Sequence, residues 1–119
     1  MTDEELLLHY QTGDALAFTQ LVEAHGDHLY GFVQNQGLNP ALAADITQET
    51  WMKLILKLEL LCDQIKQDPE WFRLKGYLYT IAANLVRDHW RRAGRITYMS
   101  DGEDLLDSDA TPPLRVLSR

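Results

Sequence analysis

The stretch DITQETWMKLI, at residues 45–55, gathers acids, amides and a methionine on one short segment. At helical spacing its polar side consists of Asp45, Gln48, Glu49, Met52 and Lys53. The opposite, largely apolar side consists of Ala43, Ile46, Thr50, Trp51, Leu54 and Leu58 and is expected to face the core. Like charges four residues apart, as in Asp45 and Glu49, repel each other mildly, and a partner with basic side chains would relieve that repulsion. On this pattern alone the polar side is either a solvated surface or a surface that holds a partner.

The basic side chains are concentrated in one segment. Residues 1–72 carry three basic and twelve acidic side chains, residues 73–95 carry six and one, and residues 96–119 carry two and five. The resulting charges of −9, +5 and −3 sum to the net charge of −7. A positive segment inside a negative chain indicates local phosphate binding. The alternative is that these residues complement the dipole at a helix C-terminus.

Residues 73–92 separate into distinct faces on a helical wheel. The core face consists of Leu74, Leu78, Ile81, Ala82 and Leu85, and the cationic face consists of Arg87 and Arg91, with Thr80. One flank carries Asn84, Asp88 and Arg95, and the other carries Tyr79, Val86 and Trp90. Arginines can follow phosphates and aromatic rings can stack on bases. Asn84 and Asp88 have the chemistry to contact base edges or to orient the arginines.

Three more aromatic residues lie at the start of this segment, namely Trp71, Phe72 and Tyr77. From a loop and the helix turn that follows it, their rings could insert into an opened duplex. The alternative for each is that the ring folds back onto the core.

The elements that must position these groups are all helices, because no stretch alternates like a strand. A first helix is capped by Thr2 or Asp3 and ends at Gly13, and a second is capped by Asp14 and ends at Gly37. The pair Asn39-Pro40 starts a third helix, at residues 40–60. Residues 61–72 are expected to form a loop, and a fourth helix covers residues 73–92 or slightly more. The sequence therefore predicts an all-α fold, a compact bundle of about four helices.

Length and composition set the domain organisation. A chain of 119 residues with 45% hydrophobic residues is sufficient for one domain, predicted at residues 1–95. Residues 96–119, rich in acids, glycine and proline, are expected to be an acidic flexible linker. The start of the chain lacks the order of a secretion signal, no apolar run is long enough to insert into a membrane, and Cys62 is the single cysteine. A cytoplasmic protein is therefore expected.

Catalytic and metal-binding motifs are not found. His25 and His28 could share a metal at their spacing, but no Cys/His set with zinc spacing accompanies them. Cys62 could be redox-active, although a small apolar filler is the simpler interpretation. No glycine-rich phosphate loop or nucleophile motif is present. We therefore expect no catalytic residues, no metal, no cofactor and no enzyme activity.

Four stretches resemble one known family in the same order. AADITQETWMKLI resembles the Ala-x-Asp-Leu-x-Gln-Glu-x-Phe motif of bacterial RNA polymerase sigma factors of the extracytoplasmic-function (ECF) group. GYLYTIAANLVRDHWRR resembles the family's Trp-Leu-x-x-Ile-Ala-x-Asn-x-x-x-Asp-x-x-Arg-Arg. The opening DEELLLHYQTGDALAFTQLVEAHGDHLYGFV and the acidic linker after Gly94 are similar to their counterparts in the family. The resemblance covers about residues 2–95 and is to the N-terminal domain, region 2.

The resemblance implies roles for individual residues. The polymerase-binding residues, which would contact the clamp helices of the largest subunit, are Asp45, Gln48, Glu49, Met52 and Lys53. The residues implied to lie near the −10 promoter element are Asn84, Arg87, Asp88, Arg91 and Arg92. With the aromatics and the last arginine of the basic segment, the predicted DNA-binding set also includes Trp71, Phe72, Tyr77 and Arg95. The loop at 61–72 would correspond to the loop that captures a flipped base of the non-template strand.

These roles predict a sigma factor domain that docks on core polymerase and recognises and melts the −10 element. An anti-sigma factor is a further implied partner. The alternative is a sigma-like interaction module that binds polymerase or an anti-sigma factor without opening DNA. An autonomous DNA-binding regulator is a third hypothesis, but a clear helix-turn-helix pair is lacking and the overall charge is unfavourable.

The sequence departs from the family pattern at several points. Tyr77 replaces a frequent tryptophan, Ala83 replaces a frequent arginine, and the stretch between Trp51 and Tyr77 is longer than usual. The family's C-terminal region 4 domain, which reads the −35 element, has no counterpart. We therefore expect a fragment of a longer protein, with a natural single-domain protein as the alternative.

Overall fold

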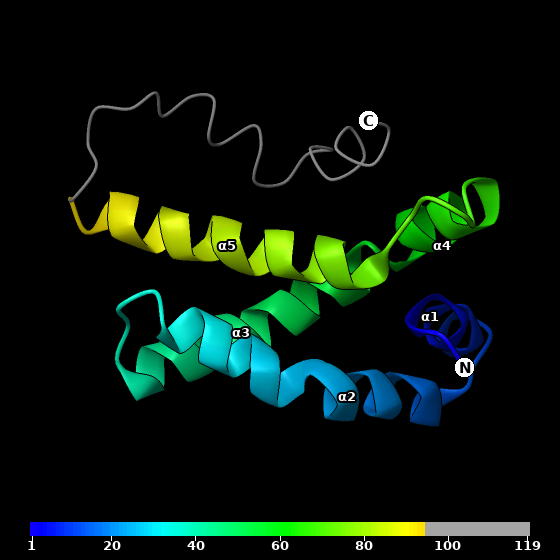
Figure 1. Ribbon diagram of the computed structural model, residues 1–119, viewed down its shortest axis with the longest axis horizontal. Helices are drawn as coiled ribbons and strands as arrows, with labels where there is room; N and C mark the ends of the chain where they lie inside the picture. Colours follow the sequence, from blue (N-terminus) through cyan, green and yellow to red (C-terminus); the bar gives the residue numbers. More distant parts are fainter. Residues whose placement is uncertain (95–119) are drawn as a thin grey trace.

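In the computed structural model, which describes residues 1–94, the chain forms five α-helices (Figure 1). The helices are α1 (Asp3–Gln11), α2 (Ala15–Gln34), α3 (Pro40–Leu56), α4 (Leu58–Gln67) and α5 (Leu74–Arg92). No strand occurs within residues 1–94. The predicted all-α fold is therefore confirmed.

The starts of the first three helices are fixed by local capping. Thr2 Oγ1 accepts a hydrogen bond from Glu5 N at 3.1 Å, and Glu5 Oε1 accepts one from Thr2 N at 3.0 Å, which is a capping box. Asp14 Oδ1 accepts from Leu16 N at 3.1 Å at the start of α2. Asn39 Oδ1 accepts from Leu42 N at 2.8 Å at the start of α3. These starts agree with the predicted ones because caps are local signals.

The segment after α3 differs from the prediction of one long helix and a loop. Helix α3 ends at Leu56, Lys57 adopts a non-helical conformation (φ −102°, ψ 16°), and α4 then continues to Gln67. The expected loop at 61–72 is reduced to residues 68–73. The physical reason is that residues at three- and four-residue spacing in this segment are apolar and bury against the bundle. These residues are Leu61, Cys62 and Ile65.

The helices enclose one core. Helix α3 packs against both α2 and α5, while α1 packs between α2 and α4 at one end of the bundle (Figure 1). Leu7, Leu21, Leu29, Leu54, Leu61 and Leu78 are among the fully buried side chains. Burial of each such leucine stabilises the fold by about 1.5–3 kcal/mol. The arrangement leaves an outer face of α3 exposed, whereas residues 77–91 of α5 are buried or half-buried.

Two turns need glycine. Gly13 follows α1 with a φ of +112°, and Gly37 follows α2 with a φ of +93°. Residues with a Cβ atom rarely adopt this backbone region. At Gly37 a Cβ atom would also lie 3.6 Å from Cζ2 of Trp90. The turn between α2 and α3 is therefore packed closely against the last part of α5. Within residues 1–94, no helix is both long and apolar enough to cross a membrane.

Candidate functional site

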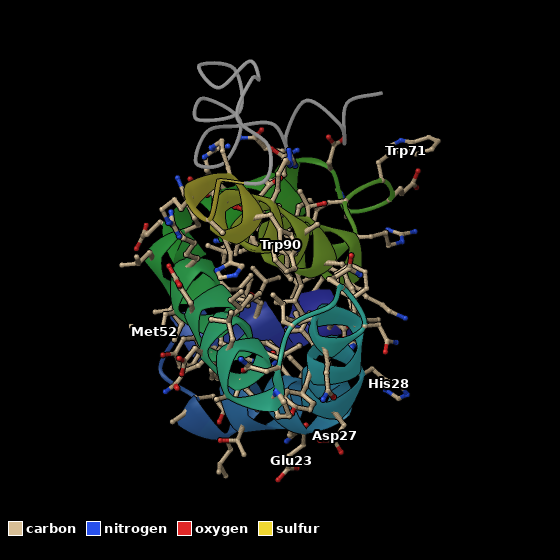
Figure 2. The ribbon with its side chains drawn as sticks, turned by 90° about the vertical axis from the view of Figure 1, so that its left-hand side faces the viewer. Glu23, Asp27, His28, Met52, Trp71 and Trp90 are labelled. Atoms are coloured by element: carbon tan, nitrogen blue, oxygen red, sulfur yellow. The ribbon has the colours of Figure 1, made fainter. Side chains whose placement is uncertain are left out.

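The outer face of α3 carries the predicted polar set. Asp45, Gln48, Glu49 and Met52 are exposed and Lys53 is half-buried. Figure 2 shows Met52 pointing away from the bundle, and its side chain is 57% exposed. The predicted core side is also confirmed, with Ala43, Ile46, Thr50, Trp51 and Leu54 buried and Leu58 half-buried. This face of α3 is therefore a surface that a partner could contact without unfolding the helix.

The polar face continues into apolar residues that sequence reasoning did not single out. Leu56 is 80% exposed, and Ile55 and Leu60 are 38% and 40% exposed. With Met52 they form what we call the apolar extension, which runs from the end of α3 across Lys57 into α4. Its signal in the sequence is the spacing 52, 55, 56 and 60, which continues the outward face of the helix. Exposed apolar residues gathered at one place are typical of an interaction surface.

The arginines of α5 are oriented by polar side chains one turn earlier. Arg87 Nη2 donates to Asn84 Oδ1 at 2.5 Å, and Arg91 Nη2 donates to Asp88 Oδ1 at 2.6 Å. Asn84 is buried, so its amide is directed at Arg87 and not at solvent. Of the two roles considered for Asn84 and Asp88, these contacts are those of arginine orientation. Arg92 is exposed, and Arg95 lies outside the described residues.

The three aromatics predicted to face DNA differ in their surroundings. Trp71 is 71% exposed and projects from the loop between α4 and α5 (Figure 2). Phe72 and Tyr77 are buried, at 0% and 6% exposure, with ring centroids 6.5 Å apart. In this conformation these two rings cannot stack on a base, because the core covers them. Their position corrects the expectation of exposed rings at 72 and 77 and agrees with the alternative of rings folded onto the core.

The aromatics on the second flank of α5, Tyr79 and Trp90, pack against α2 and the turn that follows it. Tyr79 is half-buried and lies edge-to-face with Phe32 of α2, with centroids 5.1 Å apart. Trp90 is half-buried, close to Gly37 and 5.0 Å from the ring of His89. The predicted core face of α5 is confirmed, because Leu74, Leu78, Ile81, Ala82 and Leu85 are all buried. The core stripe is thus wider than the wheel indicated, since Tyr77, Asn84 and Val86 join it.

The first turn of α5 borders a shallow depression of about 410 Å³. Its described lining consists of Arg73, Lys75, Gly76 and Tyr79. A Cβ atom at Gly76 would meet no atom within 4 Å, so the space beside it is open. The lining is mainly apolar, so the depression suits a flat apolar group such as a base.

The other candidate chemical groups have structural partners. His25 Nε2 lies 2.8 Å from Asp3 Oδ2 and joins α2 to α1, whereas His28 points to solvent beside Asp27 (Figure 2). Cys62 is buried, and desolvation by burial raises the pKa of its thiol, although Lys66 opposes this. Within residues 1–94, no group of three or more His, Cys, Asp or Glu side chains is placed to hold a metal ion.

The described part of the chain is an all-α bundle with an exposed acid–amide face on α3 and oriented arginines on α5. Residues 21–96 match the family Sigma-70 region 2, and the chain belongs to this family. The resemblance found in the motifs of α3 and α5 is thereby confirmed.

Two curated relatives are ECF sigma factors. The chain is 30% identical over 105 residues to the ECF RNA polymerase sigma factor BldN of Streptomyces coelicolor, covering 88% of this chain and 37% of that protein. It is 32% identical over 96 residues to the ECF RNA polymerase sigma factor SigE of Mycolicibacterium smegmatis, covering 78% of this chain and 34% of that protein. The chain thus spans about a third of the length of these relatives. No solved structure gives a significant match.

Proposed function

We propose that this chain is the part of an ECF sigma factor that docks on core RNA polymerase and recognises and melts the −10 promoter element. The observation that carries the proposal is that one bundle of the Sigma-70 region 2 family has both an exposed acid–amide face on α3 and oriented arginines on α5. A docking face alone would serve any polymerase-binding protein. Both surfaces together suit a protein that holds polymerase and DNA at once.

We propose that this chain contacts the clamp helices of the largest polymerase subunit through its own residues Asp45, Gln48, Glu49, Met52 and Lys53. The exposed carboxylates of Asp45 and Glu49 suit basic side chains on the partner. The apolar extension lies beside them and offers desolvated contact area, which usually contributes more to affinity than charges at the rim. This surface would give orientation through its charges and affinity through Met52 and Leu56.

For DNA, we propose that Arg87, Arg91 and Arg92 contact phosphates of the −10 element and that Trp71 stacks on a base of the non-template strand. Stacking of an aromatic side chain is worth about 1–3 kcal/mol per base. Asn84 and Asp88 act through the arginines that they orient. Phe72 and Tyr77 hold the loop and the first turn of α5 in place and do not contact DNA. Free duplex should bind weakly, because the net charge of −7 opposes its approach.

An anti-sigma factor is the second proposed partner. The apolar extension is unfavourable in water, and a regulator that covers it would stabilise the unbound protein. Co-purification from the native host tests this partner. Recovery of the chain with polymerase alone would count against it.

The proposal is tested by a pull-down of core polymerase with the wild-type chain and with the double variant Gln48→Ala/Glu49→Lys. Both residues are exposed on α3, so the fold should tolerate the change. We expect the variant to lose binding. Equal binding by the two proteins would mean that the contact with polymerase lies elsewhere on the chain. No binding by the wild type would contradict the proposal.

A second measurement distinguishes the proposed function from the alternative of an interaction module that does not open DNA. The complex of this chain with core polymerase is mixed with promoter DNA that carries 2-aminopurine at the −10 element, and the fluorescence of this base rises when it unstacks. A chain that binds polymerase but gives no rise would be an interaction module only.

A further inference from the structure

Helix α5 begins without a cap from its own segment. Arg73 is the N-cap residue, yet its side chain makes no capping bond, and its Nη1 donates instead to Phe72 O at 2.8 Å. The first N–H groups of a helix have no partner within the helix and need an acceptor from elsewhere. The acceptor for Leu74 N is Glu4 Oε2 of α1, at 2.7 Å and 70 residues away in sequence. The negative charge of Glu4 also complements the positive end of the α5 dipole.

The turn that carries Glu4 is itself held in place. Asp3 Oδ2 lies 2.8 Å from His25 Nε2 and fixes this turn to α2. Glu5 completes the capping box with Thr2 and fixes the start of α1. Each of the three acids in the first turn of α1 therefore has a different partner. Glu4 is the one that reaches α5, from a frame set by its two neighbours.

The loop at 68–73 is anchored on both sides of its exposed tryptophan. Asp68 Oδ2 accepts from Gln64 Nε2 at 3.2 Å, and Asp68 O accepts from Phe72 N at 3.0 Å. The Phe72 ring is buried, and Leu74 N is held by Glu4 two residues later. Trp71 lies between these anchors and is 71% exposed. The same first turn of α5 supplies Lys75 and Gly76 to the depression beside it.

We propose that Glu4 is a positioning residue for strand opening: by capping α5 it fixes the loop that presents Trp71 and the first turn that lines the depression. The inference rests on the proposed function, since it assigns this loop to base capture. A loop that is already ordered loses less conformational freedom when a base binds to it. Loss of the Glu4 carboxylate should therefore slow opening without changing the docking face on α3.

The test compares Glu4→Ala and Glu4→Gln with a matched control, Asp14→Ala. The control removes a carboxylate that also accepts a hydrogen bond from the first turn of a helix, but Asp14 caps α2 and not α5. Three quantities are measured: hydrogen exchange at the Leu74 amide, binding to core polymerase, and the rate of the 2-aminopurine signal at the −10 element in the docked complex.

For Glu4→Ala we expect exchange at Leu74 to rise by about tenfold or more, because a charged acceptor is lost. Polymerase binding should equal that of the wild type, and opening should slow severalfold. Glu4→Gln should restore part of the rate, since its amide oxygen still accepts a hydrogen bond. Asp14→Ala should open DNA at the wild-type rate even where its melting temperature falls as far as that of Glu4→Ala.

Two results overturn the inference. One is a Glu4→Ala protein that opens DNA at the wild-type rate, and the other is an Asp14→Ala protein that is slowed equally, which would make the role of Glu4 one of stability alone. Should Glu4→Ala fail to fold, the comparison of Glu4→Gln with Asp14→Ala decides in the same way. A wild-type chain that docks but opens no DNA would instead overturn the proposed function, and the inference with it.

Discussion

Asp88 Oδ1 accepts a hydrogen bond from Arg91 Nη2 at 2.6 Å, one helical turn further along α5. A charge-assisted bond of this kind fixes the direction of a guanidinium group, which otherwise has several rotamers. The same relation joins Asn84 to Arg87 one turn earlier. The cationic face therefore holds its arginines in set directions, although the Arg91 and Asp88 side chains are only 13% and 15% exposed. The acid in the basic segment is part of the arrangement.

The first prediction concerns this pair. Asp88→Ala should weaken binding of −10 DNA by the docked complex by about three- to tenfold, because Arg91 loses its charge-assisted bond to Asp88. Asp88→Asn should lose less, since its amide oxygen can still accept. Fluorescence anisotropy of a labelled fork DNA measures the affinity. Tighter binding by Asp88→Ala would mean that repulsion between the Asp88 carboxylate and DNA phosphates outweighs the orientation of Arg91 by Asp88.

The second prediction concerns phosphate contact by Arg92. Each phosphate contact contributes close to one unit to the slope of log affinity against log salt concentration. Arg92→Gln should therefore reduce that slope by about one in the docked complex, measured with the same fork DNA. Lys66→Gln is the matched control, because Lys66 is also exposed but lies on α4. An unchanged slope for Arg92→Gln would remove this residue from the phosphate contacts.

The third prediction concerns the apolar extension. Leu56→Ser should weaken binding to core polymerase severalfold while changing the free energy of unfolding by less than about 0.5 kcal/mol, since the side chain is 80% exposed. Leu16→Ser is the control, at 69% exposure on α2. For both variants, the affinity for polymerase is measured by titration of labelled polymerase, and the stability is measured by thermal melting. Equal loss for the two variants would point to a general effect of surface hydrophobicity.

The helix starts could be predicted from the sequence because their signals are local. Thr2, Asp14 and Asn39 each cap a helix within three residues of themselves. The break at Lys57 could not, since neither glycine nor proline marks it and the helical spacing continues on both sides. The exposed polar face of α3 could be predicted because it lies on one helix.

The proposed DNA-binding side was less predictable, because its arrangement depends on contacts between helices. Whether Phe72 points inward or outward is decided by the space left between elements, which local pattern does not encode. The bond from Leu74 N to Glu4 spans 70 residues and leaves no local signal. Local pattern therefore identified the core side of α5 and the position of its arginines, but not the groups that hold the loop.

The fourth prediction follows from the raised pKa of the Cys62 thiol, which is caused mainly by desolvation on burial. The reactive thiolate is therefore scarce in the folded protein, and alkylation at pH 8 should be much slower than in urea. The unfolded thiol ionises first, near its ordinary pKa of about 8.5, so the free energy of unfolding should fall as the pH rises above that value. Rapid alkylation under native conditions would contradict the burial.

The fifth prediction separates two adjacent aromatics. Trp71→Ala should leave the melting temperature nearly unchanged, because the ring is 71% exposed, yet it should reduce opening of the −10 element by about tenfold through the loss of base stacking. Phe72→Ala should instead destabilise the fold by about 3–5 kcal/mol, because its ring is fully buried. Melting curves and the 2-aminopurine signal measure the two effects on the same samples. If Trp71→Ala opened DNA as fast as the wild type, base capture would have to be assigned to the depression formed by Arg73, Lys75, Gly76 and Tyr79, and the loop would be a spacer between α4 and α5.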